Sequence, residues 1–177
     1  MKTQHYILSA IAAGSLALAA SPLFAASSPA VGLAISASVA AKCIVSSTAE
    51  VAFGPYDPVT TNSSAGADLD TTGSVGIKCT PGNGASISLD SGSNASVNQR
   101  RMIGPSGSSS QFLLYNLYTD SPGGTAWGNG SNGASPLTIS TSTNASERTF
   151  TVHGRVPKGQ DVNTGSFSDT VQATVNF

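Results

Sequence analysis

Residues 31–43 read VGLAISASVAAKC, and an apolar side chain occupies every second position. The side chains at the odd positions are Val31, Leu33, Ile35, Ala37, Val39, Ala41 and Cys43. Alternation with a period of two residues predicts a β-strand with one buried face. The segment is longer than the usual strand of about five or six residues, and in extended form it would span about 40 Å. We therefore expect two consecutive strand segments, of which the one near Cys43 belongs to its own domain.

The first of these segments, residues 28–39, has two possible destinations. It could pair its backbone with an open sheet edge of another molecule and bury alternate side chains there. Residues 28–41 could instead fold back as an ordinary first strand of their own domain. The alternation fits both arrangements equally well, so it does not decide between them.

Short strand patterns recur along the rest of the chain, separated by turns rich in Gly, Asn, Ser and Pro. The predicted strands cover residues 50–53, 74–79, 85–90, 100–103, 112–119, 137–140, 149–157 and 167–177. Residues 112–119 (FLLYNLYT) are the most apolar, and we expect them in the centre of a sheet, buried on both faces. Closely spaced strands without a sustained helical period predict an all-β sandwich.

The last strand pattern, residues 169–177 (DTVQATVNF), again alternates apolar and polar side chains. The apolar set consists of Val171, Ala173, Val175 and Phe177. Because the pattern runs to the last residue of the sequence, we expect nothing behind it to cover the neighbouring edge and groove. Open strand edges pair readily with other chains. A strand without a partner at this end could therefore receive the N-terminal segment of another molecule.

The first 25 residues have the features of a secretory signal peptide. Lys2 supplies the positive charge, residues 6–20 form an apolar run, and small residues surround Ala25 and Ala26. The run is shorter than the roughly 20 apolar residues of a membrane-spanning helix. The predicted organisation is a signal peptide at 1–25, an N-terminal extension at 26–40 and a sandwich domain at 41–177.

The charge and the scattered polar residues argue against several function classes. Without Lys2 the chain has seven basic and nine acidic residues, so it has no basic field that would attract nucleic acid. His153 has no nucleophile motif beside it. Asp68 and Asp70 lie in a Ser/Thr/Gly loop without a third acidic ligand, and we expect them in a solvated turn. We predict no catalytic residue, no metal, no cofactor and no enzymatic activity.

Cys43 and Cys79 are the only cysteines. An even number of cysteines in an exported chain predicts a disulfide, whereas a redox CxxC motif is absent and metal ligands are lacking. The two positions are 36 residues apart, so the bridge would stabilise the domain by about 4 kcal/mol through loop closure.

Several motifs follow one another in a recognisable order. They are Cys43, FGPYDP at 53–58, Cys79, YNLYTD at 115–120, Trp127-Gly128, GRVP at 154–157, GSFSDTV at 165–171 and the final TVNF. In this ordered set the chain resembles the spore coat protein U-like domain, and within that group it is similar to subunits of archaic chaperone–usher pili. Phe167 departs from the family pattern, which has tyrosine there, so one hydroxyl contact is lost.

The resemblance implies an incomplete immunoglobulin-like β-sandwich that lacks its last strand and carries an N-terminal donor-strand extension. The implied donor residues are Val31, Leu33, Ile35, Ala37 and Val39. The implied acceptor residues are Val171, Ala173, Val175 and Phe177. A periplasmic chaperone would first lend a strand to the acceptor groove, and at an outer-membrane usher the extension of the next subunit would replace it.

The implied function is that of a fimbrial subunit at the cell surface. It would polymerise with identical or related pilin subunits and support adhesion and biofilm formation. Two alternatives belong to different classes: a carbohydrate- or surface-binding module, and a self-complemented secreted coat protein.

Overall fold

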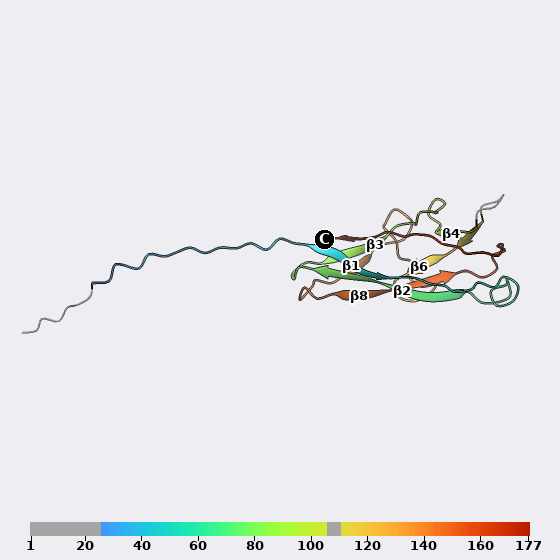
Figure 1. The fold of residues 1–177 in the computed structure, drawn as a ribbon, viewed down its shortest axis with the longest axis horizontal. Coiled ribbons are helices and arrows are strands. Elements are labelled where there is room, and N and C mark those ends of the chain that lie inside the picture. Colours follow the sequence, from blue (N-terminus) through green and yellow to red (C-terminus); the bar gives the residue numbers. More distant parts are fainter. Residues whose placement is uncertain (1–25, 106–110) are drawn as a thin grey trace, which may run out of the picture. The chain divides into compact units, whose positions relative to one another are not determined.

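A computed structural model describes residues 26–105 and 111–177, and Figure 1 shows the fold. The strands are β1 (Cys43–Ala49), β2 (Leu69–Cys79), β3 (Ala85–Leu89), β4 (Arg101–Ile103), β5 (Phe112–Leu114), β6 (Asn116–Tyr118), β7 (Leu137–Ile139), β8 (Arg148–Val156) and β9 (Ala173–Asn176). The described residues contain no helix, and so no helical segment of them could cross a bilayer. The predicted all-β class is confirmed, whereas the predicted signal peptide lies outside the described residues.

The described residues form two units, residues 26–37 and residues 38–177. The first unit contains no regular secondary structure, and its apolar side chains are exposed: Val31 is 90% exposed, Leu33 85% and Ile35 88%. The second unit contains all the strands listed above. The functional division at residue 40 remains a prediction.

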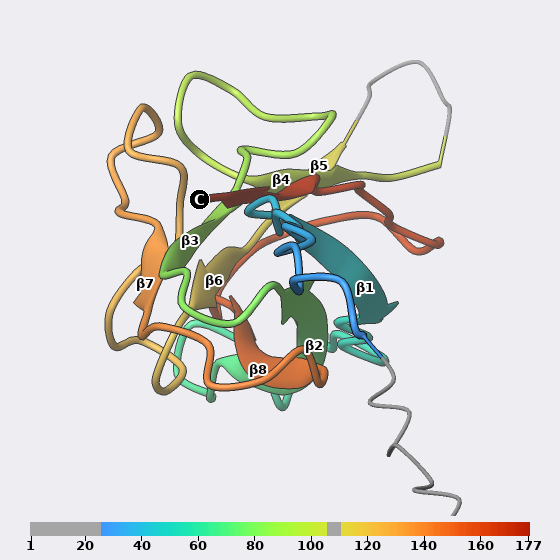
Figure 2. The ribbon, with the colours of Figure 1, turned by 90° about the vertical axis from the view of Figure 1, so that its left-hand side faces the viewer.

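The second unit is an immunoglobulin-like sandwich of antiparallel sheets. One sheet has the strand order β1-β2-β8-β6, a second has the order β7-β3-β9, and β4 pairs with β5. Figure 2 shows β2 and β8 on one side of the interior, with β3 and the C-terminal strand on the opposite side. β1 and β9 are each the outermost strand of their sheet.

The core forms because inward positions of facing strands carry apolar side chains. On β2 these include Val75 and Ile77, and Val75 lies directly opposite Phe150 of β8. Trp127 is completely buried, and its indole N–H donates to the carbonyl oxygen of Ile87 at 2.8 Å. This bond satisfies the one polar atom that the buried indole carries. Trp127 is thus part of the hydrophobic core.

The prediction of a central strand at residues 112–119 is wrong. The segment is interrupted at Tyr115, so that β5 pairs with β4 and β6 lies at the edge of the four-stranded sheet. Only alternate residues are buried: Leu113, Tyr115 and Leu117 face the core, whereas Leu114 is exposed. A short strand that changes from one sheet to another has one buried face, although its sequence is apolar almost throughout.

The predicted strand at residues 50–53 is also not formed. The strand ends at Ala49, and the chain then crosses over the inner surface of the first sheet. This crossing requires Gly73, because a Cβ atom there would lie 2.6 Å from the carbonyl oxygen of Ala49. Gly154 on the neighbouring strand likewise leaves room for Val51 and Phe53.

Candidate functional site

An apolar groove of about 1060 Å³ opens between the sheets of the second unit. Its floor is made of buried core side chains: Val75, Leu89, Leu113, Tyr115, Leu117 and Val152. The first bank consists of residues 48–56, and the second bank consists of residues 162–171 together with Ala173. The groove therefore runs along the hydrophobic core, between the first bank and the second bank.

The backbone beside the groove is available for pairing. β1 pairs only with β2, and β9 pairs only with β3, among the strands of the described residues. The carbonyl oxygens of Thr170 and Gln172 accept hydrogen bonds from residues 90–93, on the β3 side. Because backbone direction alternates along an antiparallel strand, the N–H and C=O groups of Val171 and Ala173 point to the opposite side. This side is the one that borders the open groove.

The first bank is held on the sheet by close packing more than by hydrogen bonds. The Thr71 hydroxyl donates to the carbonyl oxygen of Ala52 at 2.8 Å. Val51 and Phe53 are half-buried, and Phe53 lies over Gly154. Farther along, the Tyr56 hydroxyl donates to the carbonyl oxygen of Pro157 at 3.1 Å, which fixes the end of this bank to the chain after β8.

The second bank is held by polar contacts to the loop after β3. Asp90 Oδ1 accepts the backbone N–H of Gln172 at 2.9 Å, and the backbone N–H of Ser93 donates to the carbonyl oxygen of Thr170 at 3.0 Å. Asp169 Oδ1 accepts the backbone N–H and the side-chain amide of Asn94, at 3.1 and 2.9 Å. These contacts hold residues 169–172 beside the loop after β3, although the regular strand begins only at residue 173.

Tyr115 connects the floor of the groove to both banks. Its hydroxyl donates to Asp169 Oδ2 at 2.7 Å, in the second bank. Its ring meets the ring of Phe53, in the first bank, edge-on, with centroids 6.1 Å apart. Burial of the phenol, with the hydrogen bond to Asp169 as the next cause, raises the pKa of Tyr115 above its ordinary value. The phenol is therefore a neutral donor.

Arg100 stabilises the end of β3 and the start of the loop that follows it. It is 5% exposed, and its guanidinium donates to the carbonyl oxygens of Leu89 and Asp90, with distances of 2.6–3.1 Å. Burial lowers the pKa of Arg100, and the nearby Tyr115 and Asp90 act in the opposite direction.

The predicted acceptor residues occupy different environments. Val171 and Ala173 line the groove, and Val175 packs against the core. Phe177 is 60% exposed and is not among the lining residues. The groove thus extends toward residue 162, away from the end of the chain, and the acceptor role of the four residues remains a prediction.

The predicted donor residues are exposed. Val31, Leu33, Ile35 and Ala37 belong to the first unit and are exposed, and Val39, at the start of the second unit, is 84% exposed. Soluble proteins do expose single apolar residues, but a row of them at every second position indicates a surface for interaction. Their donor role remains a prediction.

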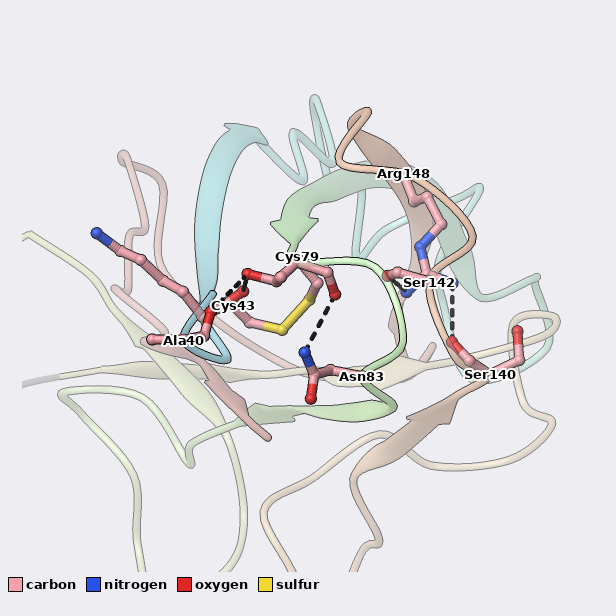
Figure 3. The surroundings of a disulfide bond; sticks show 9 residues. Ala40, Cys43, Cys79, Asn83, Ser140, Ser142 and Arg148 are labelled. Carbon is pink, nitrogen blue, oxygen red and sulfur yellow. Dashed lines mark hydrogen bonds between the residues drawn. A yellow bond between two sulfur atoms is a disulfide. The ribbon is translucent and has the colours of Figure 1, made fainter. Parts of the chain in front are cut away.

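The predicted disulfide is present. Cys43, the first residue of β1, is bonded to Cys79, the last residue of β2, with an S–S distance of 2.03 Å (Figure 3). The next residue along the chain, Thr80, donates its backbone N–H to the carbonyl oxygen of Lys42 at 2.8 Å and its hydroxyl to that of Ala40 at 3.3 Å. The start of the sandwich is therefore anchored immediately after the donor-like segment.

The loop beside the disulfide is bonded to two further segments (Figure 3). The side-chain amide of Asn83 donates to the carbonyl oxygen of Thr80 at 3.2 Å. Arg148 donates to the carbonyl oxygen of Ser140 at 2.9 Å and to the hydroxyl of Ser142 at 2.8 Å. The turn after β2 is joined to the loop before β8 by backbone bonds, from the Gly82 N–H to the Ser142 carbonyl oxygen at 2.8 Å and from the Ser142 N–H to the Asn83 carbonyl oxygen at 2.9 Å.

The expectation of a solvated turn at Asp68 and Asp70 is wrong. Both carboxylates pair with Arg155 of β8: Nε lies 2.7 Å from Asp70 Oδ1, and Nη1 lies 3.2 Å from Asp68 Oδ2. These contacts raise the pKa of Arg155, with the hydrogen bond to Asp70 as the main cause. The pair stabilises the β2–β8 ladder at one end. Among the described residues no three His, Cys, Asp or Glu side chains are grouped as metal ligands would be.

Sequence reasoning missed most of the groove: the first bank, the part of the second bank before residue 169, and the connecting role of Tyr115. A usable signal was present for Asp169. In the alternating pattern, Asp169 lies on the same face as Phe167 and Val171, and all three residues are half-buried. A carboxylate on the buried face of an alternating strand requires a hydrogen-bonding partner, which predicts a buried donor such as Tyr115.

Comparison with known proteins identifies relatives in sequence and in fold. Protein U of Myxococcus xanthus is 37% identical over 180 residues, which cover 96% of this chain and 96% of that protein. The fold resembles a chain in the crystal structure of the CsuC–CsuE chaperone–tip adhesion subunit pre-assembly complex from archaic chaperone–usher Csu pili of Acinetobacter baumannii. That match has a TM-score of 0.52 and 21% identity, and it covers 78% of this chain but only 40% of that chain.

The family assignment comes from sequence. The Spore Coat Protein U domain matches residues 30–174, a range that includes the donor-like segment from residue 30 onward and nearly all of the sandwich. Together with the relative that matches along almost the entire chain, this establishes that the protein belongs to the Spore Coat Protein U domain family.

Proposed function

We propose that the protein is a structural subunit of a surface pilus that polymerises by donor-strand exchange. In this proposal, the alternating segment at residues 31–39 of one copy enters the groove of another copy. It forms backbone hydrogen bonds with the open edge beside Val171 and Ala173, and its apolar side chains pack on the apolar floor of the groove.

One observation carries the proposal: the same chain contains a strand-sized apolar groove and an exposed alternating segment. The groove has a buried apolar floor and an open strand edge beside it. The segment places four large apolar side chains on one face, Val31, Leu33, Ile35 and Val39. Burial of each contributes about 1.5–3 kcal/mol, and backbone pairing adds to this. These gains oppose an ordering cost of about 1–2 kcal/mol per residue, so a preformed groove is needed.

The arrangement of donor and acceptor determines the assembly. Each copy gives its N-terminal segment and receives another through a different surface, and such head-to-tail contacts build open fibres. A periplasmic chaperone would cover the groove before assembly, and an outer-membrane usher would exchange the chaperone strand for the next subunit. We place the fibre at the cell surface, where it supports adhesion and biofilm formation, with no enzymatic activity and no cofactor.

The test substitutes the centre of the donor face. Ile35→Asp puts a charge where an apolar side chain is to be buried, so fibres and higher oligomers are expected to disappear while the chaperone-bound subunit stays folded. Ser36→Asp, on the opposite face of the same segment, is the matched control and should still assemble. Both are measured by size-exclusion chromatography and electron microscopy of the exported protein.

The outcome also separates the competing functions. Fibre formation by Ile35→Asp would show that residue 35 is not buried in an acceptor groove. A stable wild-type monomer in which residues 31–39 are protected would indicate a self-complemented coat protein. A monomer that binds glycans regardless of residues 26–40 would indicate a carbohydrate-binding module.

A further inference from the structure

Residues 168–172 lead from the second bank into β9 and belong to no regular ladder. Their regular contact with another strand is an isolated bridge, in which Ile103 and Ser168 exchange backbone hydrogen bonds of 2.9 and 3.0 Å. Strand β9 begins only at Ala173. Backbone hydrogen bonds from Asp90 and Ser93 to the carbonyl oxygens of Gln172 and Thr170, together with side-chain contacts, hold this stretch beside the groove.

Asp169 is at the centre of that stretch and is directed inward. Its two carboxylate oxygens accept three hydrogen bonds: two from Asn94 on the outer side and one from Tyr115 on the groove floor. A partly buried carboxylate is costly without such donors, so these bonds restrict the carboxylate to one position. Gly92 packs against the same carboxylate so closely that a Cβ atom there would collide with it.

Tyr115 is the residue through which the two banks are connected. Its hydroxyl binds Asp169 of the second bank, and its ring packs edge-on against Phe53 of the first bank. The side chain is 5% exposed and sits at the position where the chain leaves β5 for β6, so its own placement is fixed by two sheets. A rigid side chain that contacts both banks sets the distance between them.

We propose that Tyr115 and Asp169 are positioning residues that hold the groove at strand width before a strand enters. The inference rests on the proposed function, because the width matters only if the groove receives an extended segment. Without the Tyr115–Asp169 bond, residues 168–172 keep their backbone bonds to Ile103 and to the loop at residues 90–94 but lose their bond to the groove floor. The edge presented to an incoming strand is then less ordered in advance, and the incoming strand must supply that ordering cost.

The experiment measures strand capture directly. The full chain is exported with Ile35→Asp, so that it offers a groove without donating its own segment. A fluorescent synthetic peptide of residues 28–40 is then added. Tyr115→Phe removes only the hydroxyl, and Asp169→Asn keeps the shape of the side chain. Loss of one buried hydrogen bond predicts peptide association slowed about tenfold in each variant.

Two controls distinguish positioning from a general loss of stability. Tyr118→Phe removes a hydroxyl from the next tyrosine along the chain, and Trp127→Phe removes the buried bond to Ile87 without altering a groove-lining residue. Both should associate with the peptide within about twofold of the parent. The inference is overturned if Tyr115→Phe captures the peptide at the parent rate, or if Trp127→Phe slows it as much as Tyr115→Phe does.

A second readout does not need the peptide. Amide hydrogen exchange of residues 168–172 should accelerate in Tyr115→Phe but not in Tyr118→Phe, while the exchange of β2 stays unchanged. Equal exchange in both variants would contradict the positioning role. If the parent protein fails to bind the peptide at all, the proposed function itself is refuted, whereas binding that ignores Tyr115 and Asp169 refutes only this inference.

Discussion

At the residue scale, Asp57 organises the turn that follows the first bank. Its carboxylate accepts the backbone N–H groups of Val59 and Thr60, at 2.9 and 3.0 Å, and the hydroxyl of Thr60. These bonds, led by that of the Thr60 hydroxyl, lower the pKa of Asp57 from 3.8 to about 2. The adjacent Asn62 is buried, and its side chain bonds the backbone of Asp57 and Ala67. These side-chain bonds add to the backbone hydrogen bonds of the turn, such as the one from the Asn62 N–H to the Asp57 carbonyl oxygen at 2.8 Å.

The lowered pKa predicts how Asp57 contributes to stability as a function of pH. The unfolded chain binds a proton at Asp57 more readily than the folded one, so the contribution is complete above pH 3.8 and is lost as the pH falls to about 2. Asp57→Asn should therefore be less stable than the wild type at pH 7, and the difference should shrink between pH 4 and pH 2. Urea unfolding at several pH values measures this.

The matched control is Asp161→Asn, at an exposed position. The difference in unfolding free energy between the wild type and Asp161→Asn should not shrink between pH 4 and pH 2. A constant difference between the wild type and Asp57→Asn down to pH 2 would contradict the role of this carboxylate.

At the element scale, the first bank depends on a glycine in β2. A Cβ atom on Gly73 would lie 2.6 Å from the carbonyl oxygen of Ala49 and 2.8 Å from that of Glu50. Backbone atoms cannot move aside as a side chain can, so Gly73→Ala should lower the free energy of unfolding by about 1–3 kcal/mol. Chemical denaturation gives the value.

Gly84→Ala is the control for this substitution. A Cβ atom at Gly84 would meet its nearest neighbour at 3.7 Å, an ordinary contact. Alanine there should be neutral or slightly stabilising, because it restricts the unfolded chain. Equal unfolding free energies for Gly73→Ala and Gly84→Ala would mean that residues 49–53 do not pack against β2 at Gly73.

The disulfide gives a second prediction at this scale. It joins the first residue of edge strand β1 to the last residue of β2, across a separation of 36 residues. Replacing Cys43 and Cys79 by Ser should cost about 4 kcal/mol in unfolding free energy and lower the yield of exported protein. Reduction of the wild type should have the same effect on the urea midpoint. An unchanged midpoint in either case would mean that the bridge adds nothing to stability.

Sequence patterns predicted elements well where one strand has one simple environment. β3, β4, β7 and β8 match the predicted ranges to within one or two residues. On β8 the alternation reports a single buried face, because Val152, Gly154 and Val156 are buried and the residues between them are not. The prediction of one central strand at residues 112–119 was wrong because an apolar run does not reveal where a strand changes from one sheet to another. The prediction of a strand at residues 50–53 was wrong because this segment crosses the inner surface of the first sheet. The space for that crossing is created by Gly73 and Gly154, which are far away in sequence.

At the scale of the whole molecule, the sequence correctly predicted an all-β sandwich with one disulfide. It did not predict the extent of the groove. The second bank begins at Val162, in a stretch whose Asn, Thr, Gly and Ser residues resemble an ordinary loop. A bank made of irregular chain leaves no periodic signal, because polar contacts from distant residues hold its shape.

The central claim is that residues 31–39 of one copy complete the sandwich of another. Hydrogen–deuterium exchange of the isolated subunit and of assembled fibres tests it most directly. We predict rapid exchange of residues 31–39 in the isolated subunit, and strong protection of both these residues and the backbone of Val171 and Ala173 in the fibre. Fibres in which residues 31–39 still exchange rapidly, or an isolated monomer in which they are already protected, would contradict the account.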